Sequence, residues 1–263
     1  MEKIKYEIYT RPEHTSWVVL VHGAGGSAKT FGRQIATFSK HFNLLIPDLR
    51  DHGRSNAMET LDSDDFSLDL VAKDVLDLMD DLGIKNAHFM GISLGSIIIR
   101  MIEQQAPDRI LSIVIGGGVL KFNTRTTLLF NTAVFLSRYI SYYRLYSIVA
   151  WILMPRANHK VARRLFARES KKINRKAFRI WLTIVARLKG QLDHMFTQPF
   201  KRPALMIMGG QDFAFLGDSH EFSRRFPESL LSIIPACGHL CNLERPSEFN
   251  DRSLNFFLAV ETT

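Results

Sequence analysis

The sequence predicts an α/β protein with a doubly wound, mostly parallel sheet, and three observations support this prediction. Short apolar segments that read as buried strands alternate with segments of helical spacing along most of the chain. Such alternation is typical of βαβ units, whose strands run parallel. Glycine-rich and polar motifs follow several predicted strands, where open α/β sheets build their sites. A length of 263 residues with 46% hydrophobic and 23% charged residues suits one globular domain of this class.

The individual elements follow from periodicity. Apolar residues at helical spacing predict a helix from Leu68 to Leu82 that stops at Gly83. Further helices are expected to start near Ser96 and at Pro246. The predicted strands are an opening strand in 1–7 and the segments 17–21, 42–47, 86–90, 110–115, 204–208 and 230–234.

The pentapeptide from Gly91 to Gly95 places Ser93 between a predicted strand and a predicted helix. G-x-S-x-G at such a junction is the nucleophile-elbow pattern. The sharp turn leaves no room for side chains two residues to either side of the serine, which explains both glycines. The competing interpretation, an ordinary turn serine, is weakened because the rest of a catalytic apparatus follows in order.

A nucleophilic serine needs a base and an acid that orients the base, and the chain order here is serine, acid, histidine. Asp212 follows the predicted strand 204–208, and His239 follows the strand 230–234. Asp212 could instead cap the next helix, and Asp218 is a weaker candidate for the acid. His22 and His52 are expected to hold loops, and His194 and His220 to lie on the surface.

An oxyanion hole needs two backbone N–H groups aimed at the developing charge. Leu94, directly after Ser93, supplies one candidate. The glycine-rich loop after the predicted strand 17–21 supplies the other, and Ala24 is the expected donor.

These motifs together resemble those of the α/β-hydrolase superfamily over nearly the whole chain. They comprise His22-Gly23, the segment 48–55 with Asp51 where glycine is commoner, the Ser93 elbow, Gly209 to Asp212, and Gly238-His239. The resemblance implies an α/β-hydrolase fold with an inserted helical cap. The expected division is a core of residues 1–118 and 203–263 and a cap of residues 119–202.

The expected cap is strongly basic. Residues 121–202 contain 18 Lys and Arg but only two acids, Glu169 and Asp193, against a net charge of +8 for the whole chain. Four interpretations are compatible with this charge: a solvated helical face, attraction to an anionic membrane surface, steering of an anionic substrate or acidic carrier, and nucleic-acid binding. The last is disfavoured, since no nucleic-acid-binding module is recognisable. The apolar run Leu145 to Met154 is too short to span a bilayer but suits an acyl pocket or lipid contact.

The favoured function is that of a serine hydrolase that cleaves a carboxylic ester with an apolar acyl part. Ser93 would attack, His239 would transfer the proton, Asp212 would orient His239, and Ala24 and Leu94 would hold the oxyanion. One alternative is a cofactor-free lyase or carbon–carbon hydrolase acting on an anionic metabolite. Another is a ligand-binding signalling protein that retained the triad. The sequence does not identify the substrate-binding residues.

No metal or cofactor is expected. Cys237, Cys241 and His239 give three candidate ligands with no evident fourth, which is poor spacing for structural zinc. Two cysteines do not form a disulfide framework, so they indicate free thiols in a reducing compartment. A cytoplasmic location, peripheral at the membrane if the cap binds lipid, is the corresponding expectation.

Overall fold

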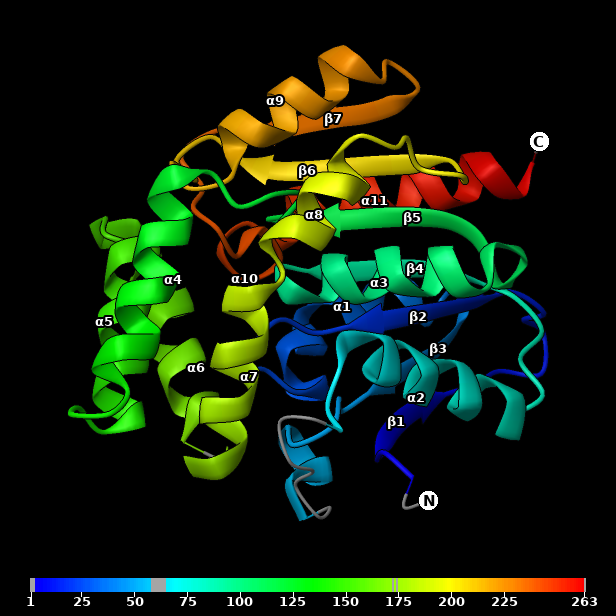
Figure 1. Ribbon diagram of the computed structural model, residues 1–263. Helices are drawn as coiled ribbons and strands as arrows, with labels where there is room; N and C mark the ends of the chain where they lie inside the picture. Colours follow the sequence, from blue (N-terminus) through cyan, green and yellow to red (C-terminus); the bar gives the residue numbers. More distant parts are fainter. Residues whose placement is uncertain (1–2, 58–64, 172, 174, 263) are drawn as a thin grey trace.

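The fold is a doubly wound, mostly parallel α/β sheet with inserted helices, as predicted. The computed structural model describes residues 3–57, 65–171, 173 and 175–262 (Figure 1). Its sheet has seven strands in the order β1-β3-β2-β4-β5-β6-β7, and only β1 runs antiparallel to its neighbour. The strands are β1 (Tyr6–Tyr9), β2 (Trp17–Val21), β3 (Asn43–Pro47), β4 (Ala87–Ile92), β5 (Ile110–Gly116), β6 (Ala204–Gly209) and β7 (Ser229–Ile234).

Helices cover both faces of the sheet. In Figure 1, α2 (Leu68–Asp81) and α3 (Leu94–Gln105) lie in front of the strands, with α1 (Gly32–Phe38) and α11 (Pro246–Glu261) behind. Helix α9 (Leu216–Arg225) joins β6 to β7, and the short α10 (Cys241–Glu244) precedes α11. Helix α2 begins after Ser67, whose hydroxyl accepts a hydrogen bond from the Leu70 N–H at 3.1 Å.

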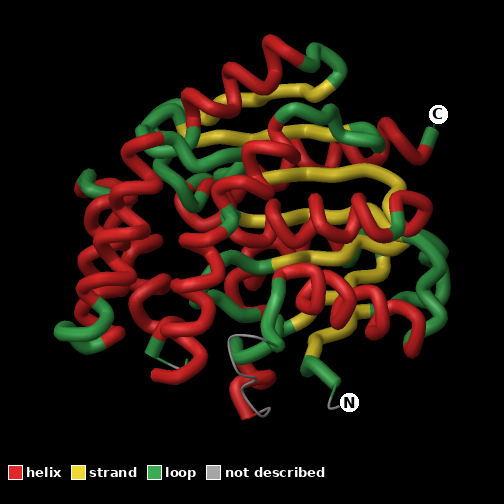
Figure 2. Tube along the Cα trace, viewed as in Figure 1, coloured by secondary structure: helices red, strands yellow, loops and turns green. Residues whose placement is uncertain are grey.

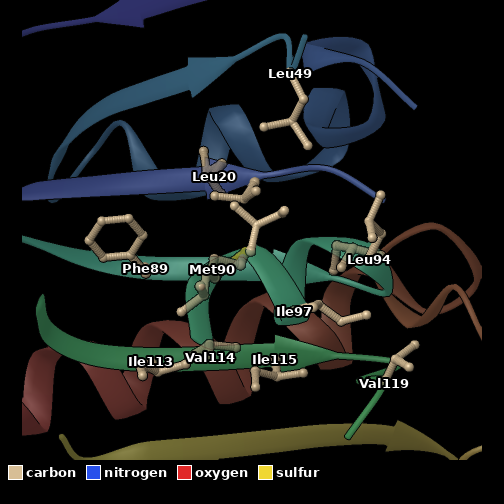
Figure 3. Packing of buried hydrophobic residues seen from close by; sticks show 14 of the residues in the cluster. Leu20, Leu49, Phe89, Met90, Leu94, Ile97, Ile113, Val114, Ile115 and Val119 are labelled. Atoms are coloured by element: carbon tan, nitrogen blue, oxygen red, sulfur yellow. The ribbon is translucent and has the colours of Figure 1, made fainter. Parts of the chain in front are cut away.

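The hydrophobic core is centred on β4 and its two neighbours in the sheet, β2 and β5. All six residues of β4 are buried, and Phe89, Met90, Ile113 and Val114 are inaccessible to solvent. Figure 3 shows these side chains in one cluster with Leu20 from β2 and Ile97 from α3. A strand buried on both faces reads as a continuous apolar run, which explains why the sequence pattern identified these strands.

Two predicted boundaries beside Ser93 were wrong. Strand β4 runs on to Ile92, past the expected end at Met90, and α3 begins at Leu94 instead of near Ser96. The reason is that the strand and the helix meet at Ser93 with no loop between them. The junction is therefore sharper than a pattern of apolar residues can indicate.

A layer of helices is inserted between β5 and β6. It contains α4 (Thr124–Leu136), α5 (Tyr142–Leu153), α6 (Lys160–Ser170), α7 (Arg175–Arg187) and α8 (Lys189–Phe196). Figure 1 shows α4 to α7 beyond the arrowheads of β5 and β6, at the end of the sheet where Ser93 lies. Figure 2 draws the described part of this segment as helices and loops. Among the described residues, none of the helices is long and apolar enough to cross a bilayer.

Candidate active site

Ser93 occupies the strained turn between β4 and α3. Its backbone has φ 53° and ψ −115°, a conformation that L-residues rarely adopt. The Ser93 N–H donates to the Gly116 carbonyl at 3.0 Å, and Ser96 Oγ donates to the Ser93 carbonyl at 2.6 Å. These bonds hold the turn rigidly. The serine side chain therefore stands at the N-terminus of α3, where the helix dipole favours negative charge.

Gly91 and Gly95 make this turn sterically feasible. A Cβ on Gly91 would lie 2.8 Å from the Gly95 carbonyl, and a Cβ on Gly95 would lie 2.1 Å from the Val21 carbonyl oxygen. Both distances are far below van der Waals contact, so only glycine fits at either position. The close approach brings α3 against the end of β2, directly before the loop that carries Ala24.

The structure brings Ser93, His239 and Asp212 into one hydrogen-bonded chain. His239 Nε2 lies 2.9 Å from Ser93 Oγ, and His239 Nδ1 lies 2.8 Å from Asp212 Oδ2. Because a carboxylate only accepts, Nδ1 carries the proton and Nε2 is the acceptor for the serine hydroxyl. Asp212 and His239 are both buried. This is the geometry that nucleophilic serine catalysis requires.

Asp212 is not the N-cap of the next helix, which was its alternative interpretation, because α9 begins at Leu216 and its N-cap is Phe215. The second oxygen of Asp212, Oδ1, instead accepts hydrogen bonds from the Ala214 and Phe215 N–H groups at 3.2 and 3.3 Å, in the turn before α9. The contacts with this turn and with His239 use different oxygens and are compatible. Asp218 accepts from Asn123 Nδ2 at 3.1 Å. His194 and His220 are exposed, as expected.

Ala24 and Leu94 lie beside Ser93 around one cavity. Within the described part of the chain, neither the Ala24 N–H nor the Leu94 N–H donates a hydrogen bond. The Ala24 carbonyl, by contrast, accepts from the Tyr146 hydroxyl of α5. Two unused N–H donors beside a nucleophile are what an oxyanion hole requires.

His22 and His52 hold the loop that carries Ala24. His52 Nε2 accepts from the Gly25 N–H at 3.0 Å, and its Nδ1 donates to the Arg50 carbonyl at 2.9 Å. His22 Nε2 accepts from the Leu49 N–H at 3.0 Å, and Nδ1 donates to the Gly23 carbonyl. Each acceptor nitrogen must be unprotonated. Burial lowers the pKa of both imidazoles, to about 4 for His52, which keeps them neutral.

Acidification is expected to destabilise the fold through His52. The pKa of His52 falls from its ordinary 6.5 to about 4 on folding, so only the unfolded chain binds a proton between these values. The contribution of His52 to the free energy of unfolding is therefore fully present above pH 6.5 and is lost as the pH falls toward 4. The full difference corresponds to about 3 kcal/mol of unfolding free energy. Urea unfolding at about pH 7.5 and about pH 5 measures most of it.

His52→Gln is expected to reduce this pH dependence, because glutamine offers a donor and an acceptor but does not titrate. His220→Gln, at an exposed position of α9, is the matched control and should keep the wild-type dependence. Equal pH dependence in all three proteins would contradict the assignment to His52.

The inserted helices make polar contacts with the loop of Ala24 that the sequence did not reveal. Besides Tyr146, Glu169 of α6 contributes its buried carboxylate, which accepts from Ser27 Oγ at 2.9 Å. Neither contact has a local sequence signature, since each joins residues more than a hundred positions apart. The position of the loop that carries Ala24 therefore depends on the inserted helices.

Another contact with the inserted helices explains Asp51, which stands where glycine is the commoner residue. Asp51 has φ 64°, which accounts for the usual glycine. Its Oδ2 accepts from Trp181 Nε1 of α7 at 3.2 Å. The Trp181 ring also packs edge-on against His52, with ring centroids 4.9 Å apart. Asp51 therefore adopts a less favourable backbone conformation than glycine would, but its carboxylate forms a hydrogen bond with the inserted helices.

A further contact joins the inserted segment to the loops of Asp212 and His239. His159, in the 3₁₀ turn Ala157–His159, is fully buried, and its Nε2 lies 2.9 Å from Gln211 Oε1. Glu244 Oε2 lies 3.7 Å from His159 Nε2 and accepts from the Gly238 N–H at 2.8 Å. Burial raises the pKa of the Glu244 carboxyl. Gln211 and Gly238 are the direct neighbours of Asp212 and His239, so this cluster supports both loops.

The cavity beside Ser93 is lined almost entirely by apolar side chains. It has a volume of about 110 Å³ and lies between the sheet edge and the inserted helices. Cap residues that line it include Phe130, Leu145, Val149, Phe178 and Leu182. Cys237 and Cys241 are buried free thiols and do not line it.

The fold, with its strand–Ser93–helix turn, is that of an α/β hydrolase. Residues 18–252 match the alpha/beta hydrolase family, and the chain belongs to that family. The protein is thus a hydrolase by family, and the fold with inserted cap helices agrees with its structural neighbours.

The relatives have varied names. A protein of Caulobacter sp. (strain K31), provisionally named carbamate hydrolase RutD, is 27% identical over 91% of this chain and 89% of its own length. The enol-lactonase of Burkholderia xenovorans LB400 superimposes with a TM-score of 0.81 at 22% identity, covering 97% of this chain and 96% of that chain. A thermophilic esterase of Thermogutta terrifontis has a TM-score of 0.80 at 18% identity, covering 98% and 93%. At these identities the two solved structures are evidence for the fold alone.

Proposed function

We propose that the protein hydrolyses a carboxylic ester with an apolar acyl part through an acyl-enzyme. The observation that carries this proposal is the Ser93–His239–Asp212 hydrogen-bond chain at the wall of an apolar cavity. Hydrolysis of esters and lactones by the named structural relatives is in keeping with it. The cap is proposed to be residues 119–202, and the core the remainder.

In this mechanism Ser93 Oγ attacks the ester carbonyl while His239 Nε2 accepts its proton. Asp212 holds the Nδ1–H of His239 and stabilises the imidazolium that forms. The N–H groups of Ala24 and Leu94 donate to the oxyanion. His239 then gives the proton to the leaving alcohol, and a water activated by the same nitrogen releases the acid.

The cavity supports an apolar acyl group because its polar atoms are already engaged. His52 is bonded to Gly25 and Arg50, the Tyr146 hydroxyl to Ala24, and Trp181 Nε1 to Asp51. Among the described lining residues, this leaves the Ser93 hydroxyl as the side-chain group available to a substrate. Burying a carboxylate there without a partner would cost several kcal/mol.

The same observation disfavours the alternative of a lyase or carbon–carbon hydrolase for an anionic metabolite. None of the described residues that line the cavity is Lys or Arg. Arg100, the nearest arginine in sequence, is buried against Glu103 at 2.6 Å and against the carbonyls of Met195, Gln198 and Pro199. Its guanidinium is therefore paired within the fold and does not face the cavity.

A turnover assay separates the other alternative, a ligand-binding signalling protein that retained the triad, from an esterase.

We expect kcat/KM for p-nitrophenyl esters to rise with acyl length and then to fall once the cavity is full. Each buried methylene contributes about 0.8 kcal/mol, or roughly fourfold, while room remains. Ala133→Phe should lower kcat/KM for the longer esters by at least about tenfold and leave the acetate ester little changed, because Ala133 lines the cavity. A chain-length series from acetate to dodecanoate measures this.

Thr132→Phe is the matched control, since it adds the same side chain one residue away at an exposed position of α4. It should reproduce the wild-type profile. Turnover no faster than the buffer reaction at every chain length would contradict ester hydrolysis and favour the signalling alternative. An identical shift in both variants would place the acyl pocket elsewhere.

The small-molecule ester is the primary partner in this proposal. Contact with an anionic membrane, one of the interpretations that the sequence leaves open for the basic cap, is proposed through the outer side of the cap.

A further inference from the structure

We propose that the outer surface of α5 and α6 is a docking surface for an anionic lipid membrane. The surface, called here the α5–α6 face, comprises the apolar residues Ile148, Trp151 and Ile152 and the basic residues Lys160, Arg163 and Arg164. Docking through this face would be a property of the cap and does not depend on turnover.

The first observation is that α5 is apolar on both sides. Tyr146 and Val149 face the acyl cavity, whereas Ile148, Trp151 and Ile152 are 44%, 58% and 41% exposed. A surface helix usually turns a polar face to water. In α5, residues 142–153 contain only one charged residue, Arg144. The core therefore accounts for one side of the helix only.

Exposed apolar side chains are also concentrated on the cap as a whole. Of the twelve large hydrophobic side chains that are exposed in the described structure, eight lie between Leu128 and Val161. Leu128 and Phe135 on α4 are 68% and 57% exposed, and Tyr139, just after α4, is 75% exposed. Figure 1 shows α4 and α5 side by side at the edge of the molecule farthest from the C-terminus of α11. Such a concentration marks an interaction surface.

The second observation is the charge directly beside these apolar residues. Lys160, Arg163 and Arg164 line a surface depression of about 300 Å³ together with Ser147 and Trp151. The Arg163 guanidinium stacks over the Trp151 ring at 4.0 Å and donates to the Arg156 carbonyl at 2.8 Å, which fixes both side chains. Lys160 and Arg164 are exposed, and neither forms an ion pair with any described residue.

Within the described residues, neither acid of the cap is paired with the basic residues of the α5–α6 face. Glu169 is buried, accepts from Ser27 and lies 3.5 Å from Arg168 Nε, and Asp193 is paired with Lys189 on α8. The α5–α6 face therefore combines uncompensated positive charge with an exposed tryptophan and two isoleucines. Basic residues around Trp and aliphatic side chains are the composition of interfacial helices that lie on anionic bilayers.

A membrane fits this composition better than a nucleic acid. Phosphate backbones would engage the lysine and arginines but would leave the three apolar side chains in water. A bilayer satisfies both sets, because the headgroups meet the cations while the indole and the isoleucines enter the interface. The acyl cavity lies on the other side of the same helix, so docking would bring it close to apolar esters held in the lipid.

The test is flotation of the full chain with phosphatidylcholine vesicles containing about 30% phosphatidylserine, and with vesicles of phosphatidylcholine alone. We expect clear binding to the anionic vesicles, weaker binding to the neutral ones, and loss of binding between about 0.1 M and about 0.5 M salt. The Ser93→Ala protein should bind equally well. This separates failure of docking from failure of the proposed hydrolysis.

Two variants locate the surface. Lys160→Glu with Arg164→Glu should lower the partition coefficient on anionic vesicles by about thirtyfold or more. Lys40→Glu with Lys85→Glu changes the net charge equally but acts at exposed positions before β3 and β4, at the far end of the sheet, and should change it by less than about threefold. Trp151→Ser with Ile148→Ser should weaken binding as well. Ile8→Ser with Leu230→Ser, which removes exposed apolar residues of β1 and β7, should not.

Three results would overturn the proposal. One is equal and negligible flotation of the wild-type protein with both kinds of vesicle. Another is an equal loss of binding in the two charge-reversal variants, which would indicate a net-charge effect without a docking surface. The third is retention on a soluble polyanion such as heparin without vesicle binding, which would assign the basic cap to a different class of partner.

Discussion

Ser93→Ala is expected to lower kcat for a p-nitrophenyl ester by about 10⁵-fold or more, because it removes the attacking atom itself. The fold should be unaffected, since alanine keeps the Cβ and the backbone bond to Gly116 holds the turn. Steady-state hydrolysis with the best substrate of the chain-length series, together with a urea unfolding curve, measures both quantities. Residual activity within about tenfold of wild type would contradict the role of Ser93.

The acid is tested against its nearest rival in the same segment. Asp212→Asn should lower kcat by about 10⁴-fold, because an amide no longer holds His239 in the tautomer that accepts the serine proton. Asp218→Asn, the matched control, should change kcat by less than about tenfold, since Asp218 contacts Asn123 and Lys121 instead of His239. Reversal of these two magnitudes would make Asp218 the acid.

Gly95→Ala is expected to destabilise the protein by at least about 3 kcal/mol and to abolish activity. The new Cβ would lie 2.1 Å from the Val21 carbonyl oxygen and 3.1 Å from that of His22, so α3 must move away from β2. That movement separates the Leu94 N–H from the loop of Ala24. Urea unfolding at neutral pH measures the loss of stability.

Gly217→Ala is the control for the chemical change itself. No heavy atom lies within 4 Å of a Cβ built at Gly217, which is in the first turn of α9. Alanine there should be neutral or stabilise by up to about 1 kcal/mol, because it reduces the conformational entropy of the unfolded chain. A Gly95→Ala protein as stable as wild type would show that the elbow can relax and that the packing argument is wrong.

Much of the fold could be predicted because its signals are local. Strands such as 17–21 and 204–208 and the helix from Leu68 repeat their apolar residues with the period of the element. The boundaries beside Ser93 were missed because a junction without a loop has no residues of its own to mark it. Helix α1 carried no distinctive pattern, and its place against α11 becomes evident only in three dimensions.

The three residues of the proposed triad were identified from the same kind of local signal. Each follows a predicted strand, and parallel strands bring their carboxyl ends to one edge of the sheet. Residues 146 positions apart in the chain, Ser93 and His239, meet there at 2.9 Å. The alternative interpretation of Asp212 as a helix cap could not be excluded from the sequence, because the start of α9 at Leu216 is visible only in the structure.

The sequence by itself determined the fold class, the candidates Ser93, Asp212 and His239 with their order in the chain, and the basic character of residues 119–202. Tertiary structure alone decided that Tyr146 and Glu169 hold the loop of Ala24, that Trp181 binds Asp51, and that α5 is apolar toward both the cavity and the solvent. The physical reason is that backbone conformation and periodicity depend on neighbouring residues. Which side chains meet across the cap depends on how separately folded helices pack, and no stretch of sequence records that.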